Sequence, residues 1–316
     1  MHVILDRLQT CPTVLHVILD RLQTCPSGGT AYYSVHPTAP DTHQLEGNIV
    51  KQPLSATAGT DFELADFATD YVEPGIEKSE AKDQTEAYGE ELAELGYRLY
   101  ADNRKSVLLV LQGMDTSGKD GTIRSIMHGL NPQSCQVTSF KAPSSEELDH
   151  DFMWRIHKAV PRRGNVRIFN RSHYEDVLVV RVHSLVPREE WQSRYQRINE
   201  FERMLTESGT TIVKCFLHIS KEEQRERLQA RLDNPNKRWK FNRGDLKERL
   251  LWDEYQAAYQ DALIRCNSAH APWHIIPSDR KWYRNFVVSR LLVNVLSDLD
   301  PQFPPPESNL DGVVVE

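Results

Sequence analysis

The segment from Gly113 to Gly121, GMDTSGKDG, has the residue types and spacing needed to bind phosphate. It matches the pattern G-x-x-x-x-G-K, follows the continuous apolar run SVLLVLQ, and leads into a helical stretch at Lys119. In that setting loop N–H groups and the helix N-terminus bind phosphate oxygens, and the lysine neutralises the transferred group. The sequence predicts a phosphate-binding loop with contacts from Gly113, Thr116, Ser117, Gly118, Lys119, Asp120 and Gly121.

One position of this loop departs from the common pattern. The residue after the lysine is Asp120, where a Ser or Thr hydroxyl normally binds Mg²⁺. Asp115, inside the loop, is the nearest alternative, because a carboxylate there would repel a phosphate chain unless a divalent cation lay between them. We therefore expect Mg²⁺ at Asp115, with Glu175 as a second ligand.

A second polar motif, VRIFNRSHYED, begins with a predicted strand that ends at Asn170. Ligands of α/β proteins bind beyond the carboxyl ends of strands, so Asn170 is expected to contact phosphate. Arg171 can bind a phosphate through two parallel hydrogen bonds. Glu175 and Asp176 are predicted to hold the metal or the acceptor, and the alternative is that both acids merely stabilise a helix N-terminus.

A third motif, RLDNPNKRWKF, runs from a helix through a Pro/Asn break into a dense group of cations. This pattern is typical of a lid that closes over phosphates and excludes water, and the alternative is a solvated loop. Lys141, at the end of a predicted strand, and Arg155 are expected to form a basic channel with it. The predicted lid covers about 231–245 and contributes Arg231, Lys237, Arg238 and Lys240.

The charge distribution supports a local polyanion site. The chain has a net charge of −7, yet residues 155–181 and 225–243 are rich in Lys and Arg. The acidic total argues against a nonspecific nucleic-acid coat. The sequence has no apolar stretch of membrane-spanning length, no basic leader, and scattered cysteines that suit neither zinc nor disulfides. These features favour a cytoplasmic protein with no membrane or nucleic-acid partner.

The elements that must position these motifs alternate between strands and helices. Strands separated by helices imply an α/β fold with three layers, α/β/α, around a parallel sheet. The predicted strands are 106–112, 136–140, 166–170, 211–219 and 273–277, and the predicted helices are 78–102, 119–129, 146–158, 187–208, 221–232, 245–268 and 280–299.

The predicted catalytic domain covers 61–303 and is flanked by two segments of different composition. Residues 1–60 are expected to form a flexible extension; within it HVILDRLQTCP occurs twice, a duplication to which we assign no function. Residues 304–316 are expected to be a loose C-terminal tail.

Seven blocks from about Asp61 to Phe303 resemble, in order, those of the polyphosphate kinase 2 family. They are GMDTSGKDG, SFKAPSSEELDHDFMWRIH, FNRSHYEDVLV, HISKEEQRERLQARLDNP, KRWKF, GDLKERLLWDEY and APWHIIPSDRKWYRN. The resemblance implies a P-loop kinase fold similar to that of thymidylate kinases, with a helical lid. It also implies Mg²⁺-dependent phosphoryl transfer between inorganic polyphosphate and nucleoside mono- or diphosphates, and a homo-oligomer, often a tetramer.

The resemblance also implies roles for particular residues. Asp115 and Lys119 become the essential loop pair, Arg171 becomes a catalytic arginine, and the lid cations become polyphosphate contacts. Asn170 stands where many members have Asp. At position 175, Glu resembles the branch of the family that accepts nucleoside monophosphates as well as diphosphates. The resemblance therefore implies AMP and ADP as acceptors, with GMP and GDP as further candidates.

Two other functions remain open on the residues alone. An NTP-dependent kinase of a small metabolite would share the phosphate-binding loop but would need no long cationic channel. A non-enzymatic polyphosphate-binding protein would share the cations but would not turn over.

Overall fold

The computed structural model describes residues 62–308, 310 and 313–315. Its centre is a five-stranded sheet in the order β2-β3-β1-β4-β5, and every neighbouring pair is parallel. This order places β1 beside β3, so the residues that follow these two strands meet at one edge of the sheet. The strands are β1 (Ser106–Gln112), β2 (Cys135–Ser139), β3 (Val166–Asn170), β4 (Thr210–His218) and β5 (Trp273–Pro277).

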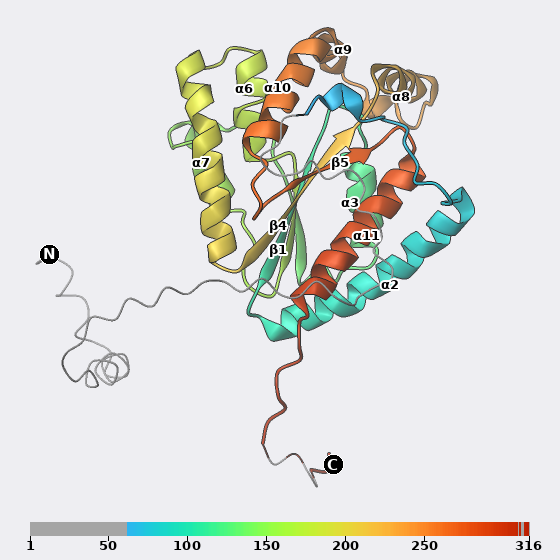
Figure 1. Cartoon of the computed structure of the whole chain (residues 1–316), viewed down its shortest axis with the longest axis vertical. Helices are drawn as coiled ribbons and strands as arrows, with labels where there is room; N and C mark the ends of the chain where they lie inside the picture. Colours follow the sequence, from blue (N-terminus) through green and yellow to red (C-terminus); the bar gives the residue numbers. More distant parts are fainter. Residues whose placement is uncertain (1–61, 309, 311–312, 316) are drawn as a thin grey trace, which may run out of the picture. The chain divides into compact units, whose positions relative to one another are not determined.

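Helices cover both faces of the sheet and form the outer layers (Figure 1). One face packs against α2 (Lys78–Asp102), α3 (Lys119–Met127) and α11 (Lys281–Leu299), and the other against α6 (Val179–Val182), α7 (Arg188–Glu207) and α10 (Trp252–Arg265). Side chains of β1 alternate between the two cores: Leu108 and Val110 join the α7 side, whereas Leu109 and Leu111 join the α11 side. The three-layer α/β/α prediction is confirmed.

The predicted lid region lies between α8 (Lys221–Asp233) and α9 (Arg243–Leu250), with the short helix η4 (Arg238–Lys240) between them. Ser220 caps α8 by accepting from the Glu223 N–H at 3.0 Å. Asn234, followed by a proline, ends α8 in an extended conformation, and Asn242 caps α9 by accepting from the Gly244 N–H at 2.9 Å. Local capping signals therefore divide this region into separate short helices.

Two helix predictions were wrong because each joined two elements. The predicted helix 146–158 is α4 (Ser145–Leu148) and α5 (Trp154–His157). Ser144 and Glu147 form a capping box for α4, and Asp151 accepts from the Met153 N–H at 2.9 Å, which starts a new turn. The predicted helix 245–268 is α9 and α10, separated at Leu251, where ψ is 26°.

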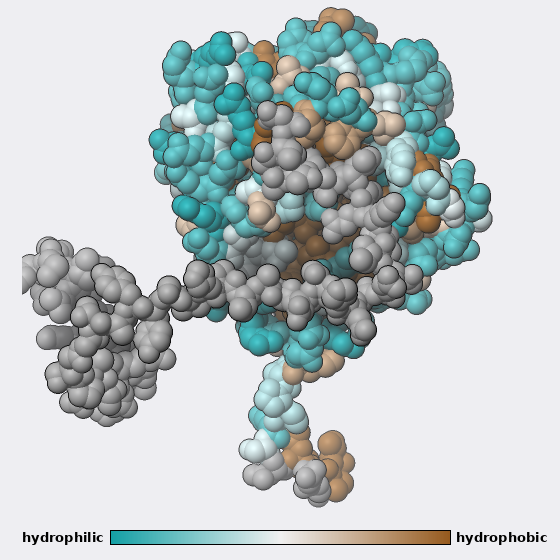
Figure 2. Space-filling model, viewed as in Figure 1, coloured by the Kyte–Doolittle hydropathy of each residue, from teal (hydrophilic) through white to brown (hydrophobic). Residues whose placement is uncertain are grey.

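Shorter elements that the sequence did not predict are η2 (Leu64–Asp66), η3 (His173–Asp176) and α6. The extension at 1–60 and its duplication lie outside the described residues, and the described part of 304–316 contains no helix or strand. Within the described segments no helix combines the length and apolar character that a membrane span requires. Hydrophilic side chains cover most of the visible helices (Figure 2).

Candidate active site

The phosphate-binding loop connects β1 to α3 and needs glycine at two positions. Gly113 has φ 148° and Gly118 has φ 108°, in the region that side chains rarely adopt. A Cβ on Gly113 would lie 2.7 Å from the Leu217 carbonyl oxygen, and one on Gly118 would lie 1.8 Å from Nη1 of Arg284. The loop is therefore packed against β4 on one side and α11 on the other.

Lys119 lies inside the curve of this loop. Its Nζ donates to the carbonyl oxygens of Gly113 at 2.6 Å and Met114 at 3.2 Å, and only 9% of the residue is exposed. Burial, together with the positive charge of Arg171, lowers the pKa of Lys119 to about 8. A phosphate group above the loop would favour the charged ammonium, so this lysine is suited to bind an anion.

Arg171 joins two carboxylates at the end of β3. Its Nη2 lies 2.8 Å from Oδ1 of Asp115, and its Nη1 lies 3.7 Å from Oε2 of Glu175. Burial raises the pKa of Glu175, and the positive charges of Arg171 and Lys119 partly offset this effect. Arg171 has φ 62°, a left-handed conformation that is unfavourable for a side chain and that is found at functional sites.

Asp120 and Asn170 pair across the ends of α3 and β3. The Asn170 amide donates to Oδ1 of Asp120 at 2.8 Å. The carboxylate therefore lies on the loop and the uncharged partner on the strand, the reverse of the usual arrangement of a loop hydroxyl and a strand-end acid. Asp120 is therefore engaged by an uncharged amide, whereas Asp115 is engaged by the Arg171 guanidinium.

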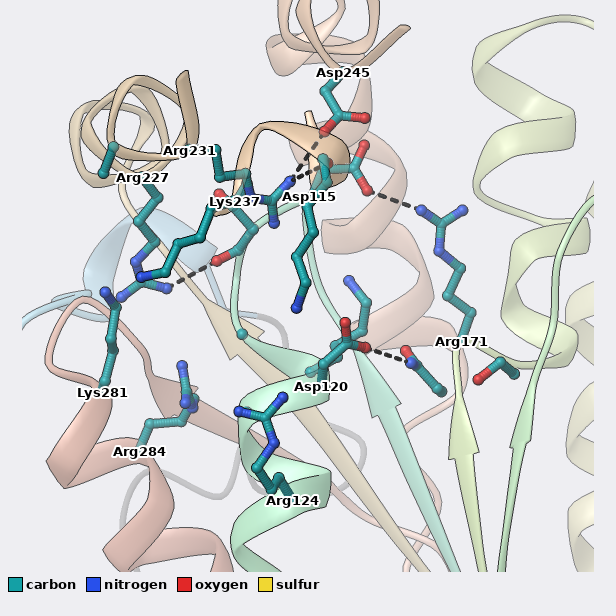
Figure 3. Close-up of a pocket in the computed structure, with 18 of the residues that line it drawn as sticks. Asp115, Asp120, Arg124, Arg171, Arg227, Arg231, Lys237, Asp245, Lys281 and Arg284 are labelled. Atoms are coloured by element: carbon teal, nitrogen blue, oxygen red, sulfur yellow. Dashed lines mark hydrogen bonds and ion pairs between the residues drawn. The ribbon is translucent and has the colours of Figure 1, made fainter. Parts of the chain in front are cut away.

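A large cleft of about 970 Å³ opens over the loop and gathers cations from six parts of the chain. Figure 3 shows side chains of α8, the lid segment and α11 facing the loop from one side, and Arg171 from the other. The cations that line this cleft are Lys119, Arg124, Lys141, Arg171, Arg227, Arg231, Lys237, Lys240, Lys281 and Arg284. Such a concentration in a chain of net charge −7 is suited to a polyanion.

A small cleft of about 260 Å³ lies on the other side of the Asp115–Arg171 pair. Tyr255 and Tyr259 of α10 line it, together with Glu175. Asp115, Arg171 and Asp245 line both clefts, and these residues therefore stand at the boundary between them. A ligand in either cleft can reach the same arginine and carboxylate.

The structure brings most of the predicted site residues together. Gly113 and Glu175 line the small cleft, and Ser117 is buried beneath the loop. The predicted residues that line the large cleft are Asp115, Thr116, Gly118, Lys119, Asp120, Gly121, Lys141, Asn170, Arg171, Arg231, Lys237 and Lys240.

Besides the buried Ser117, three predicted residues do not line either cleft. Arg155 donates to the Lys141 carbonyl at 2.9 Å and stacks its guanidinium over Phe140. Arg238 donates to the Leu232 carbonyl at the end of α8 at 2.7 Å. Asp176 pairs with Arg194 at 3.0 Å, and burial raises its pKa to about 6. These contacts support the channel wall, the lid and η3, respectively.

The sequence analysis missed several residues that hold the loop. Arg227 of α8 donates to the carbonyl oxygens of Thr116 at 2.9 Å and Ser278 at 2.6 Å, which ties the loop to the β5–α11 turn. Arg284 donates to the Ser117 carbonyl at 3.1 Å. Arg227 fell inside the basic stretch 225–243, but no motif separated it from its exposed neighbours.

Within the described segments no three His, Cys, Asp or Glu side chains form a metal-binding group. Mg²⁺ needs fewer protein ligands, because one or two carboxylates and the substrate's phosphates usually complete its shell. Asp115 and Glu175 both form ion pairs with the Arg171 guanidinium beside the loop. Burial disfavours the charged form of Glu175 unless a cation is close. These two residues fit a magnesium ion shared with phosphate.

A parallel sheet with β1 beside β3, a phosphate-binding loop after β1 and a cationic segment above it define a P-loop kinase. The family model for polyphosphate kinase 2 matches residues 75–304. The chain belongs to the polyphosphate kinase 2 family.

Individual relatives agree with this assignment. The chain is 56% identical over 227 residues to an AMP/ADP-polyphosphate phosphotransferase of Meiothermus ruber, covering 72% of this chain and 84% of the relative. It is 46% identical to an ADP-polyphosphate phosphotransferase of Rhodopseudomonas palustris, covering 68% of this chain and 78% of the relative. The crystal structure of polyphosphate kinase 2 from Arthrobacter aurescens TC1 matches with a TM-score of 0.78 and 45% identity, covering 80% of this chain and 91% of that one.

Proposed function

We propose that this protein is a polyphosphate-dependent nucleotide kinase that transfers the terminal phosphoryl group of inorganic polyphosphate to AMP or ADP. The observation that carries the proposal is the cationic large cleft directly above the phosphate-binding loop. An ordinary NTP offers three phosphates, whereas this cleft presents cations from α3, the end of β2, α8, the lid segment and α11. The names of the relatives support the same donor and acceptors.

The reaction breaks the bond between the terminal phosphorus and its bridging oxygen, and it forms a bond to a phosphate oxygen of the nucleotide. The shortened polyphosphate leaves with the electron pair of the broken bond. The nucleotide oxygen is already ionised near neutral pH, so no general base is required. Lys119 and Arg171 stabilise the charge on the transferred group, and the remaining cations hold the chain.

The two clefts give the donor and the acceptor separate approaches. Polyphosphate lies in the large cleft with its end at Lys119. The acceptor's phosphate reaches Arg171 from the small cleft, whose tyrosines provide flat surfaces for the nucleoside. Asp115 and Glu175 would hold Mg²⁺, which would supply positive charge to the two phosphate groups that must approach one another.

One assay separates this function from the alternatives. Purified protein is given polyphosphate, Mg²⁺ and AMP or ADP, with no NTP present. Appearance of ADP and ATP supports the proposal. Failure to form either, with ATP-driven phosphorylation of another acceptor, would support a metabolite kinase, and binding of polyphosphate without turnover would support a binding protein. GMP and GDP in the same assay test the wider acceptor range.

The assembly and location are proposed on family resemblance. We expect a homotetramer in the cytoplasm, and light scattering of the purified protein tests the first expectation. A monomeric mass at micromolar concentration would contradict it.

A further inference from the structure

A third cleft, called here the outer cleft, lies outside the site described above and has a volume of about 1110 Å³. It is bounded by the first turns of α2, the end of α3 and the start of α11. Lys281 and Glu223 line both the outer cleft and the large cleft. The two clefts therefore meet at Lys281, which faces the cavity in Figure 3.

The half of the outer cleft near this junction is cationic. Lys78 and Lys82 of α2 line it four residues apart, on one face of the helix, together with Arg280 and Lys281. Within the described part of the chain, Lys78, Lys82 and Lys281 take part in no ion pair. All four side chains are exposed. Arg280 donates to the Asp70 carbonyl at 3.1 Å and lies 3.9 Å from the Asp70 carboxylate, so Lys78, Lys82 and Lys281 are the charges available to a ligand from solvent.

The acidic residues of the outer cleft are either engaged or lie further along α2. Glu223 pairs with Arg227 at 2.7 Å, and Asp279 accepts from the Thr69 hydroxyl at 2.7 Å. Glu86 and Glu90 lie on the later turns, towards Gly89, where α2 meets α3. The charge therefore changes from positive at Lys78 to negative at Glu90, along about 18 Å of helix.

One backbone feature adds positive potential at the junction. The α11 helix begins at Lys281 without a side-chain cap and without an acidic residue in its first turn, whereas α2 carries Glu80 in its first turn. Burial lowers the pKa of Lys281, and the charges of Arg227, Arg284 and Lys237 lower it further. These groups repel one another in the absence of an anion.

We propose that the cationic half of the outer cleft binds the distal part of a long polyphosphate chain whose terminal group lies at the phosphate-binding loop. This inference rests on the proposed function. Polyphosphate carries charge on every unit and extends beyond any single cleft, so a chain that fills the large cleft must leave it. The path past Lys281 continues over Arg280, Lys82 and Lys78.

The test compares a long polyphosphate of several hundred units with linear tetraphosphate in the double variant Lys78→Gln/Lys82→Gln. We expect the KM for the long chain to rise roughly fivefold to tenfold, as for the loss of two exposed ionic contacts, and the KM for tetraphosphate and kcat to stay unchanged. The salt dependence of the long-chain KM should also weaken. The matched control is Lys105→Gln/Arg163→Gln, which removes the same charge from exposed positions at the opposite end of the strands.

The outcomes separate this inference from the proposed function. Wild-type turnover with tetraphosphate, combined with equal long-chain KM values in the two double variants, would overturn the outer subsite alone. Lack of wild-type turnover with either donor would overturn the proposed function. A changed oligomeric mass of Lys78→Gln/Lys82→Gln, with an unchanged KM, would identify the outer cleft as a contact between copies and would also overturn the subsite.

Discussion

Arg171 donates to Asp115 at 2.8 Å, so the arginine that faces both clefts is held by the carboxylate expected to bind magnesium. A cation on Asp115 would compete with this guanidinium for the same oxygens. Binding of Mg²⁺ with the substrates would therefore release Arg171 towards the transferred phosphoryl group. The pairing would then link the arrival of the metal to the availability of Arg171.

Asp115→Asn tests this link directly. The variant keeps the shape of the side chain but removes its charge, and we expect kcat to fall about 10²- to 10³-fold. The Mg²⁺ concentration for half-maximal rate should rise. Asp120→Asn is the matched control, because Asp120 pairs with Asn170 and should leave the Mg²⁺ dependence nearly unchanged. A shift in Mg²⁺ dependence for Asp120→Asn alone would reverse the assignment.

The pKa of Lys119, lowered to about 8, predicts a pH effect on binding. As pH rises through about 8, Lys119 of the free enzyme loses its positive charge. In the complex, the bound phosphate keeps Lys119 protonated. We expect kcat/KM for polyphosphate to fall about tenfold per pH unit above this value, with kcat constant to higher pH. Lys119→Arg should have a lower rate and should no longer show the decrease in kcat/KM above about pH 8. Lys119→Ala should lose roughly 10²- to 10⁴-fold in rate. An alkaline limb that persists in Lys119→Arg would assign it to another group.

Beneath η3, the buried Lys214 donates to Glu202 at 2.6 Å, to the Tyr174 hydroxyl at 2.9 Å and to the Cys266 carbonyl at 2.6 Å. Lys214→Met leaves Glu202 buried without its cation, so we expect a loss of about 3–5 kcal/mol in unfolding free energy. Thermal unfolding should show a Tm lower by roughly 6–20 °C.

Tyr174→Phe is the control for Lys214→Met, because it removes only one hydroxyl and should cost about 1 kcal/mol. The double variant Lys214→Met/Glu202→Leu should recover much of the loss, since it leaves no unpaired charge. Equal destabilisation of the single and double variants would show that packing volume, rather than the unpaired carboxylate, sets the cost.

Gly118→Ala tests the contact between the loop and α11. The new Cβ would overlap Nη1 of Arg284, and we expect activity to fall at least about 10²-fold through displacement of the loop. Gly75→Ala is the matched control, since Gly75 also has positive φ but nothing lies within 4 Å of its Cβ position. Similar losses of activity in the two variants would indicate backbone strain as the cause.

The sequence was sufficient to predict the layers, the parallel sheet and the place of the phosphate-binding loop between β1 and α3. Continuous apolar strands such as 106–112 and the pattern G-x-x-x-x-G-K are local signals, and their geometry depends little on the rest of the chain. Arg171 was expected at the ligand-binding end of the sheet because it follows a predicted strand, whereas the position of β3 beside β1 comes from the structure. The roles of Asp115, Glu175 and the lid cations in catalysis stay predictions until they are measured.

The contributions of Arg227, Arg284 and Lys281 could not be predicted from local patterns. Each lies on a helix with several other cations. Which of these cations reaches the loop or the cleft depends on how α8 and α11 pack against the loop. Arg155 and Arg238 were predicted to line the site, but their side chains donate to backbone carbonyls instead. Helix breaks at Asp151 and Leu251 escaped prediction because hydrophobic spacing continues across them.

Arg227 has a mechanical consequence. It belongs to α8, which leads into the lid, yet its guanidinium grips carbonyls of both the phosphate-binding loop and the β5–α11 turn. A movement of α8 would therefore have to break hydrogen bonds to the phosphate-binding loop and to the β5–α11 turn, so opening of the lid would disturb the phosphate-binding loop itself.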